Sequence, residues 1–288
     1  MSTISRPNNQ ANYIRRRVGD AVMGGLCTVA ALIGLVILGI ILYTLISRGL
    51  AGLSLDVFTE PMRTPGQRGG LANAIVGSLI QTGLGALIGA PLGMAVGIYL
   101  SEVGRNSKFA SVVRFVNDIL LSAPSILIGL FVYQIVVVPM HNFSALAGSI
   151  ALALLAMPVV ARTTEDILKL VPDSYREGSI ALGARDSTTI NRVIVPAAFG
   201  GILTGILLAV ARISGETAPL IFTSLGSFNW TQDLFHPMAS LPIAIYRFAS
   251  SPYAEWVDLA WTGALIITFG VLTLNVASRI SHHLVTRG

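Results

Sequence analysis

The stretch ARISGETAPL, residues 211–220, places two ionisable side chains inside a long apolar run. Arg212 and Glu216 are four residues apart, which is the spacing of neighbours on one face of a helix. A charge at the centre of a membrane-spanning helix costs at least about 2.5–3.5 kcal/mol, so such residues normally face other helices or a polar route. We therefore take Arg212, Glu216 and the adjacent hydroxyl of Thr217 as the candidate substrate pathway.

Two interpretations of this pair are open. In the first, Arg212 and Glu216 only neutralise each other, although such a pair contributes a few tenths of a kcal/mol on an exposed helix and less when the arginine comes first. In the second, Arg212 lines a route for an anion, because its planar guanidinium can donate to two oxygens of one oxyanion. Glu216 would then weaken the attraction enough for release and accept a hydrogen bond from a protonated oxyanion. The cost of placing both charges in lipid favours the second interpretation.

The composition indicates an integral membrane protein. Of the 288 residues, 53% are hydrophobic and only 11% are charged, whereas a soluble domain has about 25% charged residues. The net charge of +5 is explained by arginines that anchor loops at the membrane surface, so lipid and not nucleic acid is the expected surrounding partner. Cys27 is the only cysteine, which excludes an internal disulfide.

Six apolar segments predict an all-α, polytopic membrane protein with six transmembrane helices. A spanning helix needs roughly 20 residues, and in lipid only a helix or a closed barrel satisfies every backbone group. The first segment is too long for the apolar region of a signal peptide, which has about 7–15 residues. The segments are about 21–46, 71–100, 115–139, 143–161, 197–224 and 259–279.

Basic residues predict the orientation of these spans. Fourteen of the nineteen arginines and lysines fall on the side that holds both termini, four fall on the other side, and Arg212 is within a span. Since basic residues are enriched in cytoplasmic loops, we expect the tails 1–20 and 281–288 to be cytoplasmic. The segments 48–70 and 224–258 are then periplasmic, and the second is expected to include a short helix.

The charged segment 162–196 predicts two short helices that lie at an angle outside the membrane. Ser174 and Glu177 have the spacing of a capping box, and local structure alone explains this glutamate. Asp186 suits the cap of a second helix, and Gly183 between them suits a bend.

Several glycines, three prolines and Asp118 lead to further expectations about the spans. Four glycines at four-residue spacing predict close packing of the second span against another helix, and three prolines are expected to interrupt spans. Asp118 is expected either to cap the third span or to pair with an arginine at the interface. The four glycines are Gly85, Gly89, Gly93 and Gly97, and the three prolines are Pro91, Pro124 and Pro158.

No enzyme site is recognisable. The sequence lacks the G-x-x-x-x-G-K-[ST] pattern that cradles nucleotide phosphates. Its histidines have no partner at a zinc-binding spacing, and its single cysteine has no obvious base. We expect no catalytic residue, metal or cofactor.

The run EGSIALGARDSTTINRVIVP resembles the EAA loop of the permease subunits of binding-protein-dependent ABC importers. Glu177, Gly178 and Ser179 stand at the three E-A-A positions, Gly183 at the following glycine and Pro196 at the final proline. Gly and Ser replace two alanines of that pattern, and two valines replace its isoleucine and leucine. Together with TGILLAVARISGETAPLIFT and SLPIAIY, the chain from about Asn73 to Ser278 resembles the PstA-type family of phosphate permeases.

This resemblance implies a type I ABC importer permease fold in the bacterial inner membrane. It implies a first span and periplasmic loop in 21–70 and a transport domain in 71–280, whose loop 162–196 couples to an ATPase. The implied function is inward movement of inorganic phosphate by ATP-driven alternating access. The implied partners are a sister permease subunit, a homodimeric ATP-binding cassette ATPase that hydrolyses the ATP, and a periplasmic phosphate-binding protein.

The resemblance also implies roles for particular residues. Glu177, Gly178, Ser179, Gly183 and Pro196 would couple to the ATPase, and Arg212, Glu216 and Thr217 would line the pathway. Two alternatives are a permease for another oxyanion and an ATP-independent secondary transporter that uses Glu216 as a proton relay.

Overall fold

The structure is a computed structural model that describes residues 9–105 and 107–285. The chain divides into two compact units, residues 1–48 and 49–288. Parts of the predicted tails 1–20 and 281–288 lie outside the described residues. Residues 49–70, which the sequence analysis grouped with the first span, belong to the second unit.

Helix α1 (Asn9–Ala51) has 43 residues and begins inside the stretch expected to be a polar tail. No proline occurs between Pro7 and Pro61 to interrupt it. The helix is therefore about twice as long as the roughly 20 residues that a span requires, and the predicted tail 1–20 is helical from Asn9 onward.

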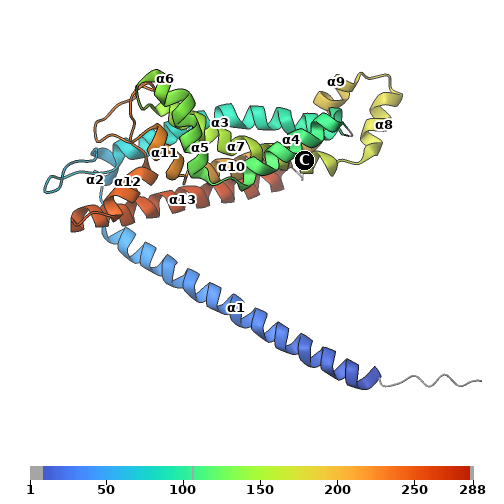
Figure 1. Cartoon of the computed structure of the whole chain (residues 1–288), viewed down its shortest axis with the longest axis horizontal. Helices are drawn as coiled ribbons and strands as arrows, with labels where there is room; N and C mark the ends of the chain where they lie inside the picture. The colour runs from blue at the N-terminus through green and yellow to red at the C-terminus, as the bar shows by residue number, and fades with distance from the viewer. Residues whose placement is uncertain (1–8, 106, 286–288) are drawn as a thin grey trace, which may run out of the picture. The chain divides into compact units, whose positions relative to one another are not determined.

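The described residues of the second unit contain helices and loops but no strand, which confirms the all-α prediction (Figure 1). Three π-helical turns, η1 to η3, interrupt the α-helices. The elements are α2 (Asp56–Thr59), α3 (Ala72–Ile98), η1 (Tyr99–Val103), α4 (Lys108–Ser122), α5 (Ser125–Val132), η2 (Tyr133–Val137), α6 (Val138–Met140), α7 (Ala145–Lys169), α8 (Asp173–Ala181), α9 (Asp186–Thr189), η3 (Ile190–Ile194), α10 (Val195–Ile213), α11 (Ala218–Thr223), α12 (Leu241–Ala249) and α13 (Ala254–Val285).

Five described helical stretches are long and apolar enough to cross a membrane, and a sixth is present if one bent pair counts as a span. The five are Tyr13–Ala51, Ala72–Val103, Ala145–Lys169, Asp186–Ile213 and Ala254–Val276. The upper count agrees with the six predicted spans.

The third predicted span, 115–139, is not one straight helix. Lys108–Ser122 and Ser125–Met140 meet at an angle of 105°. Pro124 lacks an N–H and pushes the preceding residue out of the helical region, and Ala123 accordingly has extended backbone with ψ of 135°. The expected interruption at Pro124 is confirmed, whereas Pro91 and Pro158 lie inside α3 and α7.

Close packing of α3 on α7 forms the centre of the second unit. A Cβ atom at Gly89 would lie 2.7 Å from the carbonyl oxygen of Ala153, and one at Gly93 would lie 2.5 Å from that of Met157. Only glycine permits this approach of two backbones. The predicted glycine stripe is confirmed, and α7 is its partner.

The fifth predicted span, 197–224, is also broken. Helix α10 ends at Ile213 and α11 begins at Ala218. Gly215 lies in the gap, where its lack of a side chain disfavours continuation of a helix, and Pro219 suits the first turn of the next helix. The expectation that Arg212 and Glu216 share one continuous helix is therefore wrong.

The second unit has two distinct ends (Figure 1). Helices α8 and α9 lie at one end, while α2, α6 and α12 lie at the other. Val57 and Met62 are buried in one apolar cluster with residues of α3, α12 and α13. Helix α12 is the short helix expected within 224–258.

Candidate functional site

The first candidate site is the interruption between α10 and α11. Arg212 is exposed in the last turn of α10, and Glu216 and Thr217 are partly buried in the gap that follows. Within the described residues, Arg212 and Glu216 form no ion pair with each other or with another charged side chain. The structure therefore does not contain the simple neutralising pair of the first interpretation.

A second interrupted helix packs against this gap. Helix α11 contacts α5, and a Cβ atom at Gly129 of α5 would lie 2.6 Å from the Cα atom of Pro219. Irregular backbone at membrane depth occurs only where protein buries it or where it lines a water-filled cavity. In transporters such discontinuous helices form substrate sites, so the geometry permits a polar route at Arg212.

The second candidate site is the coupling segment, which we define as α8, α9 and the turn between them, residues 173–189. Gly183 has φ of +76°, a conformation that favours glycine, and the hydroxyl groups of Ser179 and Thr189 lie 2.8 Å apart. The predicted bend at Gly183 and the short helix before it are confirmed. The second short helix is not separate, because α9 continues without a break through η3 into α10 as one helical stretch, Asp186–Ile213.

Both predicted helix caps are wrong. Pro172 provides extended backbone at the cap position, so α8 begins at Asp173 and Ser174 already lies in its first turn. Arg185 occupies the cap position of α9, and Asp186 is its first helical residue. Neither helix has a side-chain cap hydrogen bond.

The coupling segment exposes both polar and apolar groups. Glu177, Gly178 and Gly183 are exposed, and Ser179 is buried. Leu182 is 89% exposed, and Tyr175 and Ile180 are also largely exposed. Exposed apolar side chains of this kind are typical of interaction surfaces. Pro196 is exposed in the first turn of α10, beyond the coupling segment.

Sequence reasoning missed the ion pair between Arg176 and Glu102. The guanidinium of Arg176 in α8 donates to both carboxylate oxygens of Glu102 in η1, at 2.9 and 2.7 Å. Hydrogen bonds to Glu102 raise the pKa of Arg176 above its ordinary value. The only sequence signal was an acid, Glu102, close to the end of an apolar run.

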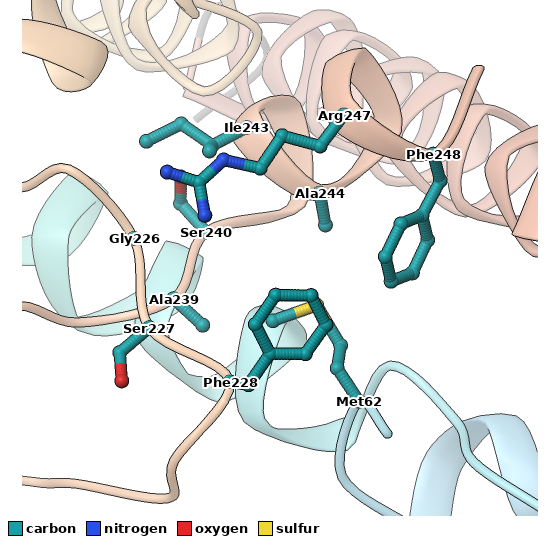
Figure 2. Close-up of a pocket in the computed structure, with 10 residues that line it drawn as sticks. All are labelled: Met62, Gly226, Ser227, Phe228, Ala239, Ser240, Ile243, Ala244, Arg247 and Phe248. Atoms are coloured by element: carbon teal, nitrogen blue, oxygen red, sulfur yellow. The ribbon is translucent and has the colours of Figure 1, made fainter. Parts of the chain in front are cut away.

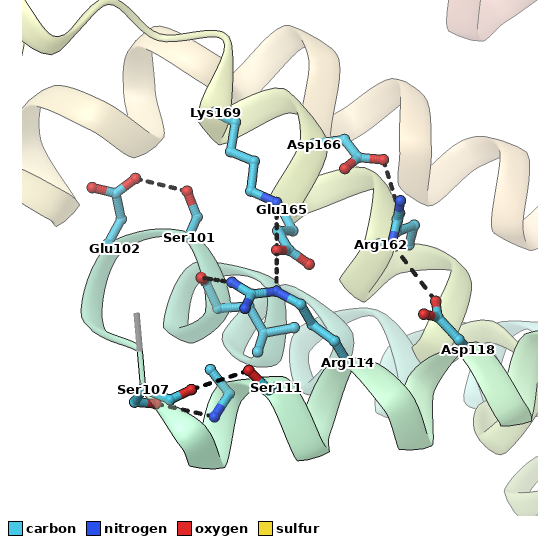
Figure 3. Close-up of polar contacts among 12 residues, drawn as sticks. Ser101, Glu102, Ser107, Ser111, Arg114, Asp118, Arg162, Glu165, Asp166 and Lys169 are labelled. Carbon is cyan, nitrogen blue, oxygen red and sulfur yellow. Dashed lines mark hydrogen bonds and ion pairs between the residues drawn. The ribbon is translucent and has the colours of Figure 1, made fainter. Parts of the chain in front are cut away.

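Two further charged groups connect α4 to α7 at the same end of the unit (Figure 3). The Glu165 carboxylate, which is 1% exposed, accepts from Arg114 at 2.7 Å and from Lys169 at 2.6 Å. Arg162 pairs with Asp118 at 3.6 Å and with Asp166 at 3.1 Å. Of the two expectations for Asp118, pairing with an arginine is confirmed.

At the other end of the unit, the cavity beside α12 is too small for an anion, whereas wider spaces open around α2 and the start of α13, lined by Arg63, Gln67, Arg68 and Glu255. A cavity of about 10 Å³ lies between α12 and residues 226–228 (Figure 2), and this volume fits about one water molecule. The buried hydroxyl of Ser240 lines it and has no described hydrogen-bond partner. The described residues also contain no cluster of three or more metal-binding side chains.

Comparison with known proteins gives the family. The model of the family described as "Binding-protein-dependent transport system inner membrane component" matches residues 89–288, which is more than half of the chain and includes both candidate sites. The chain belongs to this family. It is therefore a multi-pass inner membrane permease subunit, and the predicted resemblance to such permeases is confirmed.

Individual permeases of this family are similar over almost the whole chain. The chain is 48% identical over 275 residues to the phosphate transport system permease protein PstA of Haemophilus influenzae, with 96% of this chain and 98% of the relative covered. It is 53% identical over 268 residues to the protein of the same name from Yersinia pestis, with 92% and 90% covered. The resemblance to the PstA-type family is thereby confirmed.

The fold is shared with solved ABC importers. A chain of a bacterial alginate ABC transporter, solved in complex with an alginate pentasaccharide-bound periplasmic protein, matches with a TM-score of 0.66 and 13% identity, covering 95% of this chain and 99% of that chain. At this identity the likeness concerns the fold alone, which is that of type I ABC importer permeases.

Proposed function

We propose that this permease subunit moves inorganic phosphate across the bacterial inner membrane as part of an ATP-driven importer that works by alternating access. The observation that carries the proposal is the near full-length similarity to phosphate transport permeases, at 48% identity over 96% of the chain. The exposed coupling segment and the interrupted pathway helix support it, because an ABC permease needs both a contact for its ATPase and a polar route.

Arg212 binds the anion in this proposal. Its exposed guanidinium in the last turn of α10 offers a fork of donors that matches two phosphate oxygens. Thr217 adds a hydroxyl donor on the far side of the gap, and Glu216 lowers the attraction so that phosphate is released. The Glu216 carboxylate also accepts a hydrogen bond from protonated phosphate, which sulfate cannot donate.

The coupling segment contacts a homodimeric ATP-binding cassette ATPase in this proposal. Leu182 and Ile180 supply exposed apolar surface beside the exposed carboxylate of Glu177. Gly183 fixes the bend between α8 and α9, Ser179 holds the two helices together through Thr189, and Pro196 starts α10 with a fixed backbone angle. A rigid protruding element of this kind transmits closure of the ATPase to the spans.

The orientation follows from the basic residues at the α8–α9 end, which we place in the cytoplasm together with both termini. The opposite end then contacts a periplasmic phosphate-binding protein, and a sister permease subunit completes the pathway. An energy source is required because moving an anion into a cell that is negative inside costs about 2.3 kcal/mol per charge per 100 mV.

The test is uptake of labelled phosphate by proteoliposomes that contain the purified permease pair, its ATPase and the binding protein. We expect uptake only with ATP and ATPase on the coupling-segment side, and no inhibition by excess sulfate. Uptake without the ATPase would identify a secondary transporter. Uptake of sulfate in place of phosphate would identify a permease for another oxyanion.

A further inference from the structure

One arginine of the coupling segment has an acceptor for each of its N–H donors, and three of these bonds reach η1 and α7. Nε and Nη2 of Arg176 donate to the two oxygens of Glu102, at 2.9 and 2.7 Å. Its remaining bonds go to the carbonyl oxygens of Leu168 and Val171, at 3.1 and 2.8 Å, and to Asp173 at 3.2 Å. A guanidinium has five donors, and here each has an acceptor.

The pair is sheltered from solvent. The side chain of Arg176 is 14% exposed and that of Glu102 is 7% exposed, and Ser101 donates a further hydrogen bond of 2.9 Å to Glu102. Removal of Arg176 would leave Glu102 as an uncompensated buried charge, which is strongly unfavourable, whereas Arg176 without Glu102 still has Asp173 at 3.2 Å. The two groups therefore remain together whenever the surrounding helices stay packed.

A second ion pair between the same two regions provides a contrast. Arg105, which follows η1, contacts Asp173 of α8 through one contact of 3.4 Å, and both side chains are more than half exposed. Exposed single contacts of this kind contribute little. Arg105 therefore serves as a matched control, since it links the same elements through the same chemistry without burial.

The positions of these bonds limit how the coupling segment can move. Leu168 is in the last turn of α7, and Glu102 lies in η1, which continues directly from α3. Helices α3 and α7 themselves pack backbone to backbone along the glycine stripe. Rotation of α8 about residues 170–172 would thus break the Arg176 bonds unless α3 and α7 rotate with it.

We propose that Arg176 and Glu102 are positioning residues that form a rigid joint, through which movement of the coupling segment is transmitted to α3 and α7. This inference rests on the proposed docking of an ATPase at the coupling segment. It extends that proposal by assigning a buried, charged connection from α8 into α3 and α7, in addition to the exposed Arg105–Asp173 contact and the packing of α8 against η3.

The first readout is phosphate transported per ATP hydrolysed by the reconstituted complex. Arg176→Lys keeps the charge but cannot bond both Glu102 oxygens and both carbonyls at once, and Glu102→Gln removes the charge at constant size. We expect both variants to assemble and hydrolyse ATP, with the transport ratio reduced on the order of tenfold. Arg105→Gln should keep the wild-type ratio.

The second readout needs no substrate. In a Cys27→Ser background, spin labels at the exposed positions Ser174 of α8 and Leu87 of α3 report their distance with and without ATP. The joint predicts one narrow distance that ATP leaves unchanged in the wild type, and a distance that shifts or broadens with ATP in Arg176→Lys. The control Arg105→Gln should behave as the wild type does.

The outcomes separate this inference from the proposed function. A Ser174–Leu87 distance that shifts with ATP in the wild type, or wild-type values of both readouts in Arg176→Lys and Glu102→Gln, would overturn the joint. An equal loss of the transport ratio in Arg105→Gln would also overturn the joint. Failure of both Arg176→Lys and Glu102→Gln to assemble would do the same. If the wild-type complex does not transport phosphate, the proposed function fails, while the label distance still tests the joint.

Discussion

Arg212 and Glu216 occupy different settings although they are close in sequence. Arg212 ends a helix with its side chain exposed, and Glu216 lies partly buried in the gap beyond it. In the proposed function, the two charges act on a shared anion from separate places; they do not cancel as an ion pair along one helix face. Because the two side chains are not paired, Arg212 or Glu216 can be substituted without taking an ion-pair partner from the other residue.

Glu216→Gln should bind phosphate more tightly and release it more slowly. The substitution removes the charge that opposes the anion, and an interaction of about 1 kcal/mol changes an equilibrium about fivefold. We expect KM for phosphate and kcat for uptake to fall together by about this factor, with sulfate becoming a better competitor. Initial uptake rates in proteoliposomes measure both constants. Glu216→Asp, the matched control, should stay close to the wild type, and unchanged constants in Glu216→Gln would contradict the role.

At this scale the sequence could single out Arg212 and Glu216 as candidate pathway residues, but it could not predict which charged side chains elsewhere in the fold contact each other. A charge in an apolar run is visible in sequence because its cost in lipid is large. Arg176 and Glu102, in contrast, are 74 residues apart, and each alone is an ordinary charged residue at the end of a helix. Only the folded packing of α3 beside α7 and α8 brings them together.

At the scale of elements, both candidate sites, the gap between α10 and α11 and the coupling segment, lie where a helix ends. The interruption before α11 puts Glu216 outside the helix that holds Arg212, and the bend at Gly183 separates α8 from α9. A continuous helix would allow neither arrangement. The bend was predictable because few residues except glycine adopt positive φ. The helix starts were predicted wrongly because the extended backbone of Pro172 outweighed the capping preference of Ser174.

Gly183→Val should uncouple the complex, while Gly183→Asn should not. No atom lies within 4 Å of a Cβ at Gly183, and its φ is +76°, so the cost of a side chain comes from backbone strain of about 1–2 kcal/mol. Asparagine tolerates this conformation far better than valine does. We expect Gly183→Val to lose ATP-driven phosphate uptake in reconstituted complexes and Gly183→Asn to retain most of it. Equal uptake by the two variants would contradict a role for the bend.

Gly93→Ala should destabilise the α3–α7 pair. The added Cβ would lie 2.5 Å from the carbonyl oxygen of Met157 and 2.9 Å from the Cβ of Val160, and overpacking of this kind typically costs about 1–3 kcal/mol. Gly83→Ala is the control, because no atom lies within 4 Å of its Cβ. Thermal unfolding of the detergent-purified permease should show a lower midpoint for the first variant only. A midpoint unchanged by Gly93→Ala would mean that the close approach is absent.

At the scale of the whole second unit, the ends differ in charge and in shape. The coupling segment and the ion pairs of Arg114, Arg162 and Arg176 lie at one end, and the loop that precedes α12 lies at the other. Composition and the number of apolar segments predicted the fold class, because lipid permits few structures. They could not predict the 105° bend between α4 and α5, since a proline inside a span can also be accommodated as it is in α7.

The two ends should face opposite sides of the membrane. Cysteines introduced one at a time at Leu182 and at Asn229, in a Cys27→Ser background, should differ in labelling by an impermeant maleimide added outside spheroplasts. We expect Asn229→Cys to be labelled and Leu182→Cys to be labelled only after the cells are opened. The reverse pattern would contradict the proposed orientation.

Phosphate uptake in proteoliposomes carrying Arg212→Gln shows whether Arg212 binds the anion during ATP-driven import. Glutamine removes the charged fork, and each charge-assisted hydrogen bond contributes about 1.5–3 kcal/mol. We expect phosphate uptake to fall on the order of a hundredfold, while the complex still assembles and hydrolyses ATP. Phosphate uptake at the wild-type rate in Arg212→Gln would contradict the account.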